Sequence, residues 1–211
     1  MPSIHAPSWG NYPESESQSI APLGWQTDSL PEARPLLPRG LGRSYGDVCL
    51  NDHGILIQTR DLNHLLAFDE RTGLLRAEAG TSFADIISFA LPRGWFLPVT
   101  PGTKFVTLGG AIANDIHGKN HHGMGTIGRH IKRFELVRSN GERLVCSPTE
   151  QSELFAATIG GLGLTGLITW AELQLIPVKN GWIDEEAVPF TSLDEFFAIN
   201  DDSDKKFAYT V

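Results

Sequence analysis

Apolar residues along the chain occur in short runs in several regions and at helical spacing in one other. The short runs are rich in aliphatic side chains and are bounded by turn residues, which is typical of β-strands. They cover residues 55–59, 65–68, 74–78, 134–139, 143–147 and 167–177. Asn140 and Gly141 lie between two of these runs and form the dipeptide that most strongly favours a tight hairpin turn. The pattern therefore predicts short strands, two of them in a hairpin.

One segment has the spacing of an amphipathic helix. Its apolar face consists of Phe83, Ile86, Ile87 and Ala90. Ser82 precedes this face and Asp85 follows three residues later, a spacing that predicts a capping box. Pro92 ends the helix, because a proline disfavours helical geometry in the residue before it. A second short helix is expected over residues 149–155.

The two ends of the chain differ from this middle part. Residues 1–30 are rich in Ser and Pro and show no clear period, so we expect an irregular N-terminal arm packed by Trp9 and Trp25. Residues 179–211 are acidic and finish in a strand-like run at 207–211, which indicates the start of a further, truncated domain. Strands and helices mix without a regular β-α-β rhythm, so the fold class is α+β rather than a doubly wound parallel sheet.

Composition and charge indicate a folded protein. Hydrophobic residues make up 41% and charged residues 20%, and five Trp with eleven Phe exceed what disordered chains carry. The formal net charge of −8 gives no electrostatic reason to bind nucleic acid or an anionic membrane, although a local basic pocket for a small anion is compatible with it. The uncharged stretch 154–171 contains four glycines, so we interpret it as buried chain around a ligand rather than a membrane span.

The two cysteines, Cys49 and Cys146, form no Cys-x-x-Cys pair, which favours a reducing compartment. The first thirty residues lack the Lys or Arg of an export signal. We therefore expect a cytoplasmic location, with peripheral association with a membrane left open.

A first glycine cluster combines flexible backbone with polar side chains. Its members are Arg39, Gly40, Leu41, Gly42, Arg43, Ser44, Tyr45 and Gly46. Glycines let successive backbone N–H groups converge, while Arg43 and Ser44 add a cation and a hydroxyl donor, which together suit a pyrophosphate. The alternative is an ordinary turn, since residues 34–51 carry too much Pro and Gly for a regular element.

A second cluster spans residues 101–122. Small residues at 109–113 permit close approach of a flat ligand, and polar side chains follow them. These side chains belong to Asn114, Asp115, His117, Lys119 and Asn120. An apolar surface flanked by hydrogen-bonding side chains suits a large heterocyclic ligand. The alternative interpretation is a glycine-rich bend followed by a polar loop without a ligand.

Three further motifs do not carry the chemistry they suggest. Residues 161–166 match the Gly-x-Gly-x-x-Gly dinucleotide fingerprint, but they follow a helix and precede a strand, the reverse of the required order. The histidines of residues 117–130 lack a partner cysteine and fit no standard zinc spacing, so we expect no metal site. Gly118 and Lys119 do not belong to a Walker loop, because Ala113 stands where its first glycine belongs and Asn120 stands where its Ser or Thr belongs.

Residues 39–47, 101–103, 109–122 and 160–168 resemble the motifs of one flavoprotein family, the vanillyl-alcohol oxidase / p-cresol methylhydroxylase (PCMH) superfamily. Within it, the likeness is strongest to oxidases of polyprenyl-phosphoryl pentoses, and it extends over residues 35–177. It implies a PCMH-type FAD-binding domain over residues 31–178, built from two α+β subdomains with FAD between them. The resemblance puts the first subdomain at about 31–92 and the second at about 93–178, with a substrate domain starting at 179–211.

The resemblance also implies contacts to the cofactor. The first cluster, residues 39–46, would hold the pyrophosphate side, and Ile168 would contact the adenine end through its backbone. The cofactor cleft would be lined by Gly102, Thr107, Leu108, Gly109 and Gly110. The flavin ring would be reached by Asn114, Asp115, Ile116, His117 and Gly118. The chain departs from the pentose-oxidase branch at Asn114, where that branch has a cysteine.

The implied activity is oxidation of a sugar or polyol hydroxyl by hydride transfer to FAD. The implied substrate is lipid-linked in the pentose-oxidase branch, the electron acceptor is oxygen or a quinone-like molecule, and a reductase partner would complete an epimerisation. Arg43 stands where the aldonolactone oxidase branch has a flavin-linked histidine, so we expect non-covalent FAD. No residue matches the family's catalytic base. An aldonolactone oxidase-type enzyme and a flavin-binding module without turnover remain the alternatives.

Overall fold

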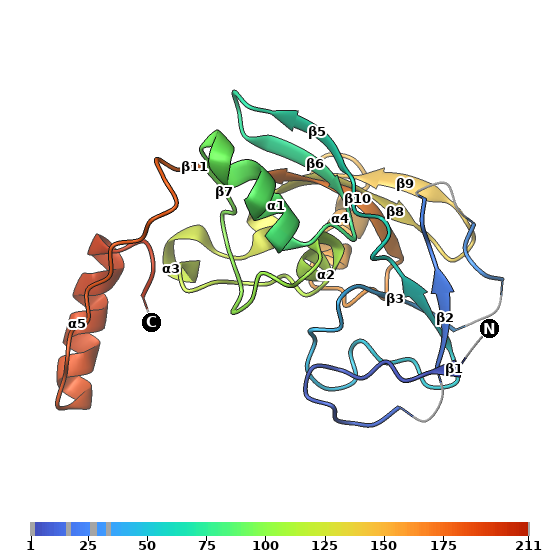
Figure 1. Cartoon of the computed structure of the whole chain (residues 1–211), viewed down its shortest axis with the longest axis horizontal. Helices are drawn as coiled ribbons and strands as arrows, with labels where there is room; N and C mark the ends of the chain where they lie inside the picture. Colours follow the sequence, from blue (N-terminus) through green and yellow to red (C-terminus); the bar gives the residue numbers. More distant parts are fainter. Residues whose placement is uncertain (1–2, 16–17, 26–28, 33–34, 211) are drawn as a thin grey trace.

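The computed structural model describes residues 3–15, 18–25, 29–32 and 35–210, and two β-sheets form its framework. The smaller sheet comes from the N-terminal part of the chain, and the larger sheet carries helices on one face (Figure 1). A two-stranded pair of β7 (Trp95–Phe96) and β11 (Ile176–Pro177) lies at one end of the larger sheet (Figure 1). The observed mixture of sheets and helices confirms the α+β class.

The smaller sheet has the strand order β1-β2-β4-β3. Its strands are β1 (Ser3–Ile4), β2 (Gln18–Pro22), β3 (Leu36–Arg39) and β4 (Ile55–Gln58). Both β2 and β3 pair in parallel with β4, whereas β1 pairs antiparallel with β2. The expectation of an irregular arm is therefore wrong where β1 and β2 lie. Trp9 and Trp25 are not buried there, since 55% and 64% of their surfaces are exposed.

Strand β3 lies inside the stretch that we expected to hold no regular element. Pro38 is tolerated there because β3 is an edge strand, and an edge position does not need every backbone N–H for pairing. Leu37 and Leu56 are buried where β3 and β4 pair, so apolar burial supports the short strand. Proline content alone therefore gave the wrong prediction for this segment.

The larger sheet has the order β5-β6-β10-β8-β9, with every neighbouring pair antiparallel. Its strands are β5 (Leu65–Asp69), β6 (Leu74–Glu78), β8 (Ile131–Val137), β9 (Arg143–Cys146) and β10 (Leu167–Gln174). The strands predicted in these regions are confirmed, and so is the hairpin at Asn140 and Gly141, where Gly141 has a φ of 84°. Strands β5 and β6 join this sheet because β6 pairs with β10, so the two sheets divide the chain between β4 and β5. The subdomain boundary expected near residue 92 stays a prediction.

Helix α1 (Phe83–Ala90) begins at Ser82, and the predicted capping box between Ser82 and Asp85 is present. The 3₁₀ turn η1 (Leu91–Arg93) follows it and contains Pro92. The second predicted helix, α4 (Ser152–Thr158), starts later than expected. Ser147 and Glu150 exchange backbone hydrogen bonds in a turn, which uses the groups that an earlier helix start would need.

The remaining helical segments were not predicted. They are α2 (Leu108–Ala113), α3 (His121–Met124), η2 (Ile127–His130) and α5 (Leu193–Lys206). Helix α2 carries two glycines, which are poor helix formers, but Leu108 and Ile112 are fully buried in the core. Core burial of roughly 1.5–3 kcal/mol per large apolar side chain outweighs that weak propensity.

The main core lies between the larger sheet and its helices. Phe83 and Ile86 from α1 and Phe155 from α4 pack with strand residues such as Phe134 and Leu173. Helix α2 is therefore held on the face of the larger sheet, and its contacts with β10 and β6 fix its orientation. This anchoring keeps the N-terminal end of α2 at the boundary with the smaller sheet.

The uncharged stretch 154–171 is divided between α4 and β10. In the described part of the chain, no helix is long and apolar enough to span a membrane.

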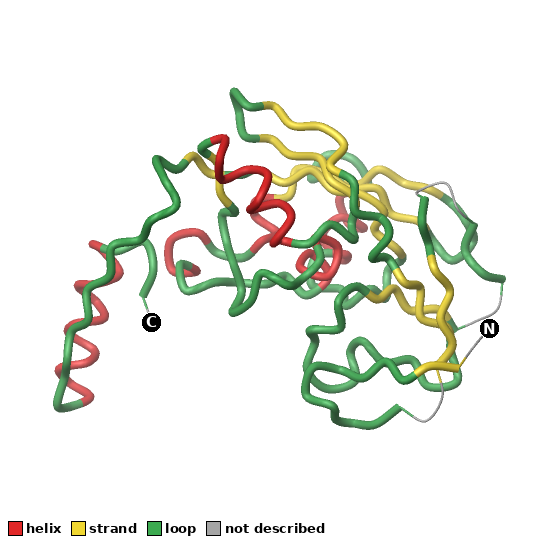
Figure 2. Tube along the Cα trace, viewed as in Figure 1, coloured by secondary structure: helices red, strands yellow, loops and turns green. Residues whose placement is uncertain are grey.

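The C-terminal part of the chain extends away from both sheets (Figure 2). It contains α5, which begins at Ser192 and has no buried residue. The strand expected at 207–211 is not formed at 207–210, and Val211 lies outside the described residues. Instead, Thr210 donates its backbone N–H to the carbonyl oxygen of Lys119, which attaches this segment near α3.

Candidate functional site

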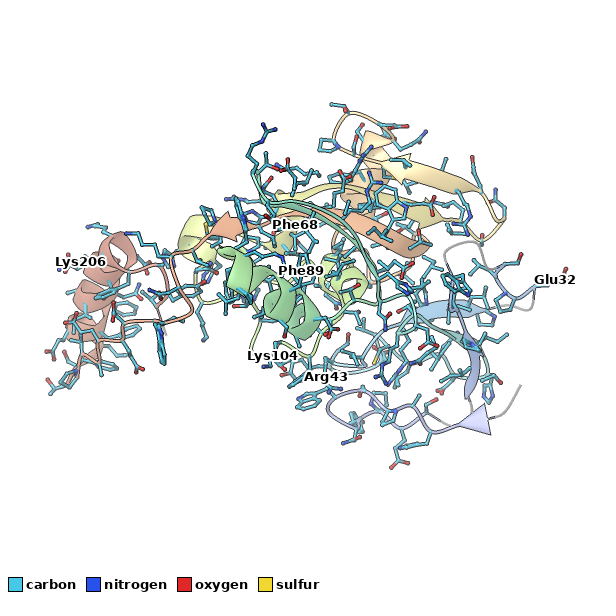
Figure 3. All side chains as sticks on the ribbon, turned by 45° about the horizontal axis from the view of Figure 1, so that its top comes forward. Glu32, Arg43, Phe68, Phe89, Lys104 and Lys206 are labelled. Atoms are coloured by element: carbon cyan, nitrogen blue, oxygen red, sulfur yellow. The ribbon has the colours of Figure 1, made fainter. Side chains whose placement is uncertain are left out.

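A cavity of about 480 Å³ lies where the smaller sheet approaches α2 and the start of β10. Its volume falls in the range of roughly 300–1,000 Å³ that is typical of small-molecule and cofactor sites. One wall comes from the segment after β3, another from α2, and a third from residues 163–168. Figure 3 shows Arg43 at the boundary between the N-terminal sheet and the part of the molecule that contains α1.

The segment after β3, residues 40–46, forms the polar wall and is called the anion loop below. β3 and β4 are parallel neighbours, so pairing with β4 fixes the start of the loop, and the chain returns to β4 at Ile55. Within the described residues, the backbone N–H groups of the anion loop donate to no protein acceptor. Gly42 and Gly46 have φ values of 64° and 61°, which other residues rarely adopt. Unpaired N–H groups in such a loop suit an anion.

The two arginines of the first cluster have different partners. Arg39 donates from its guanidinium to the carbonyl oxygens of Ala6 at 3.0 Å, Pro7 at 2.7 Å and Cys49 at 3.0 Å. Arg43 is exposed and uses Nη1 to donate to the carbonyl oxygen of Leu41 at 2.7 Å. Its remaining N–H donors make Arg43, rather than Arg39, the guanidinium that suits an anion in the cavity.

Glycines set the distance between the anion loop and α2. A Cβ on Gly40 would lie 2.3 Å from Oγ1 of Thr107, so the loop contacts the start of α2 directly. Oγ1 of Thr107 in turn accepts the backbone N–H of Gly110 at 3.2 Å. A Cβ on Gly109 would lie 2.9 Å from the Cβ of Ala79 on the other side. These contacts leave room only for glycine and keep the two walls close together.

The opposite side of the cavity is more open. A Cβ on Gly102 would meet no atom within 4 Å, so the backbone of this loop is accessible from the cavity. Ala113 and Ile116 add small and apolar surface. The site therefore joins an anion-binding loop to an apolar slot, which is the combination that a nucleotide-linked heterocycle requires.

Most of the residues predicted for the site line this cavity. They are Arg39, Gly40, Leu41, Gly42, Arg43, Ser44, Tyr45, Gly102, Thr107, Gly109, Gly110, Asn114, Ile116 and Ile168. Their direct contact with a cofactor stays a prediction.

Five predicted residues lie outside the cavity lining. They are Gly46, Leu108, Asp115, His117 and Gly118. Leu108 is fully buried in the core, and Oδ1 of Asp115 accepts the backbone N–H of Gly128 at 3.0 Å. His117 forms an isolated bridge with Thr126, and its ring lies 5.6 Å from that of His121. These contacts show structural roles that the motif alone did not indicate.

The sequence missed other residues that line the cavity. They include Trp9, Cys49, Pro101, Thr103, Gly163, Gly166 and Leu167. Gly163 and Gly166 lie in the motif 160–168 of the family resemblance, from which we expected only Ile168 to contact the cofactor, whereas their position before β10 brings them to the cavity as well. Nothing in the local sequence around Trp9 indicates its role, because its position depends on contacts with the anion loop. Among the described residues, no cluster of three His, Cys, Asp or Glu side chains is placed to hold a metal ion.

Comparison with known proteins agrees with this chemistry. The sequence model of the family described as FAD binding domain matches residues 12–147. A decaprenylphosphoryl-beta-D-ribose oxidase from Mycolicibacterium smegmatis is 42% identical over 179 residues, which cover 84% of this chain and 39% of that protein. Cytokinin dehydrogenase 8 from Oryza sativa is 32% identical over 187 residues, covering 81% of this chain and 35% of the relative.

A candidate D-arabinono-1,4-lactone oxidase from Neurospora crassa is 29% identical over 145 residues, which cover 68% of this chain and 26% of that protein. In these three relatives, the chain therefore matches 39% of the length or less.

Proposed function

The chain belongs to the FAD binding domain family, and from this premise we propose that it is the cofactor-binding part of an oxidoreductase that acts on a sugar or polyol hydroxyl. FAD is the cofactor of the family. The observation that carries the proposal is that the anion loop, whose backbone N–H groups donate to no acceptor among the described residues, faces the glycine-rich start of α2 across one cavity.

The residues of the cavity fit the two parts of FAD. The anion loop and Arg43 would hold the pyrophosphate, because converging N–H groups and a guanidinium complement its negative charge. The backbone of Gly102, Gly109 and Gly110 would leave space for the flat ring system. A net charge of −8 on the chain makes this local positive potential important for retaining an anionic cofactor.

Bound FAD would supply the redox chemistry by accepting a hydride from the substrate carbon. The residues described here would bind it, orient it and exclude water from one side. We assign no catalytic base among them. The proposed substrate domain, of which residues 179–211 would be the start, would place the hydroxyl-bearing carbon against the cofactor.

The substrate class that we favour is a polyprenyl-phosphoryl pentose, which the name of the Mycolicibacterium smegmatis relative supports. Oxygen or a quinone-like molecule would then reoxidise the cofactor, and a reductase partner would complete an epimerisation. A sugar lactone is the alternative, supported by the relative from Neurospora crassa. Arg43 favours the first class, because it stands where the lactone-oxidase branch carries a flavin-linked histidine.

Cofactor content tests the proposal most directly. The purified protein should be yellow, with flavin absorption bands, or should take up added FAD with a change in flavin fluorescence. Riboflavin is the matched control, because it has the same ring without the pyrophosphate, and we expect it to bind much more weakly. A colourless protein that takes up no FAD would contradict the proposal.

Non-covalent binding is a separate expectation. Acid precipitation should release all of the flavin to the supernatant, because Arg43 cannot form the link that a histidine makes at this position. A yellow pellet would show that another residue is attached to the flavin.

A further inference from the structure

The residues before the family match contribute to the same cavity. Residues 5–11 are called the N-terminal strap here, and they precede the matched range that starts at residue 12. The strap runs from β1 past the loop that follows β3, where Figure 1 shows the dark-blue and light-blue parts of the chain near each other. Ala6 and Ser8 within it are buried, at 6% and 3% exposure. The strap is therefore packed against the protein and is part of its folded structure.

Arg39 anchors the first half of the strap. It donates to the carbonyl oxygens of Ala6 and Pro7, and a third bond joins the same guanidinium to Cys49 at the far end of the loop region. A Cβ on Gly42 would lie 2.3 Å from Nη2 of Arg39, so the guanidinium also lies directly against the anion loop. One charged group thus fixes the strap and the anion loop relative to each other.

Trp9 makes the second attachment. Its backbone N–H donates to the carbonyl oxygen of Ser44 at 3.0 Å. Its ring lies under the guanidinium of Arg43, with Cζ 5.0 Å from the ring centroid, which is the geometry of a cation–π contact. The Trp9 side chain also lines the cavity, although 55% of its surface is exposed.

We propose that the N-terminal strap forms one wall of the FAD cleft, with Trp9 as a binding residue and Arg39 as a positioning residue. The inference rests on the proposed function and extends it to residues outside the family match. The Trp9 ring packs beside the bound cofactor at the anion loop and holds Arg43 toward the phosphates. Since the strap and the cofactor contact one another, each stabilises the bound position of the other.

Substitution of Trp9 tests the wall directly. Trp9→Ala should raise the Kd for FAD about tenfold, because it removes both an aromatic contact and the cation–π partner of Arg43. Trp25→Ala is the matched control, because Trp25 is also more than half exposed, stacks on His64 with ring centroids 5.8 Å apart and does not line the cavity. We expect its Kd to equal that of the wild type. The Kd is measured by titration with FAD and needs no turnover.

Protease protection provides an independent readout. FAD should slow chymotryptic cleavage after Trp9 in the wild type, and should slow it equally in Trp25→Ala at equal saturation. Circular dichroism of both tryptophan variants checks that they are folded.

The possible results separate this inference from the proposed function. If the wild type binds no FAD, the proposed function fails. If the wild type binds FAD and Trp9→Ala binds it equally well, the strap is not a wall of the cleft. An equal loss in Trp25→Ala, or equal cleavage with and without FAD, would also overturn the inference.

Discussion

Arg39 and Arg43 belong to one short motif, yet their surroundings give them separate roles. The sequence indicated an anion-binding cluster but could not distinguish the two guanidiniums, because both follow the same local pattern. The distinction depends on carbonyl oxygens from residues 6, 7 and 49, which only the tertiary structure brings to Arg39. Among the described residues, Arg43 donates only to the carbonyl oxygen of Leu41 and keeps other donors for a ligand.

Arg43→Ala should weaken FAD binding by roughly one to two powers of ten. A charge-assisted contact to phosphate contributes about 1.5–3 kcal/mol, which corresponds to that range of Kd. Arg71→Ala is the control, because Arg71 is an exposed arginine in the turn between β5 and β6. Unchanged affinity in Arg43→Ala would place the pyrophosphate away from the anion loop.

At the scale of elements, prediction succeeded where local signals agreed with the tertiary structure. The hairpin at Asn140 and Gly141 and the capping box of α1 are both determined by residues close together in sequence. β3 and α2 were missed because proline and glycine disfavour a strand and a helix locally, whereas pairing with β4 and burial of Leu108 stabilise them in the fold. Non-local contacts of this kind cannot be derived from a single sequence.

Ser82→Ala should lower the free energy of unfolding by about 1 kcal/mol, because it removes the side chain that accepts the backbone N–H of Asp85 at the start of α1. Chemical denaturation measures this change. Ser88→Ala is the control within the same helix, since Oγ of Ser88 only donates to the carbonyl oxygen of Ala84. We expect that variant to be unchanged or slightly more stable. Equal losses in both variants would show that the cap contributes nothing specific.

The strands of the larger sheet are joined by a charged group on β10. Glu172 accepts hydrogen bonds from Arg76 on β6 and Arg133 on β8, with N···O distances between 2.6 and 3.0 Å. Burial acts to raise the pKa of the Glu172 carboxyl, but these hydrogen bonds outweigh burial and lower its pKa below the ordinary value of 4.5. Its contribution to stability is therefore present above about pH 4.5 and is lost as the pH falls through the lowered pKa.

Glu172→Gln should lower the free energy of unfolding by about 1.5–3 kcal/mol at pH 7, the range for hydrogen bonds to charged groups. We expect a loss near the lower value of this range, because the side chains of Arg76 and Arg133 are 33% and 44% exposed and can form hydrogen bonds with water instead. The difference in unfolding free energy between this variant and the wild type should become smaller at pH values below the lowered pKa of Glu172. Denaturation at several pH values measures it, with exposed Glu186→Gln as control. A difference that is the same at every pH would contradict the charge-based explanation.

At the scale of the whole molecule, the site lies where the two sheets approach each other, and each supplies part of it. The sequence predicted both glycine clusters, and most of their residues do line one cavity. It did not predict that the N-terminal segment completes a wall, because Trp9 is far from both clusters in sequence and carries no motif. Nor did it predict the pairing of β6 with β10, which joins segments far apart along the chain.

We predict that residues 1–211 bind FAD but do not oxidise a polyprenyl-phosphoryl pentose, a sugar lactone or a similar polyol at a useful rate. We expect the described residues to hold the cofactor and a further domain to hold the substrate. Flavin absorbance under anaerobic conditions measures turnover, and dithionite reduction is the control that the bound flavin can be bleached. Sustained bleaching by a substrate would show that no further domain is needed.

The central position of β10 in the larger sheet determines when the cleft can form during synthesis of the chain. β10 lies between β6 and β8, so the sheet stays open until residue 174 has left the ribosome. Until then β5 and β6 have no partner on one side and expose an edge and an apolar face. The anion loop is synthesised much earlier, but the wall that faces it is completed late. The nascent chain therefore carries an unpaired strand edge, the feature that favours aggregation, for longer than it would if β10 preceded β8 in sequence.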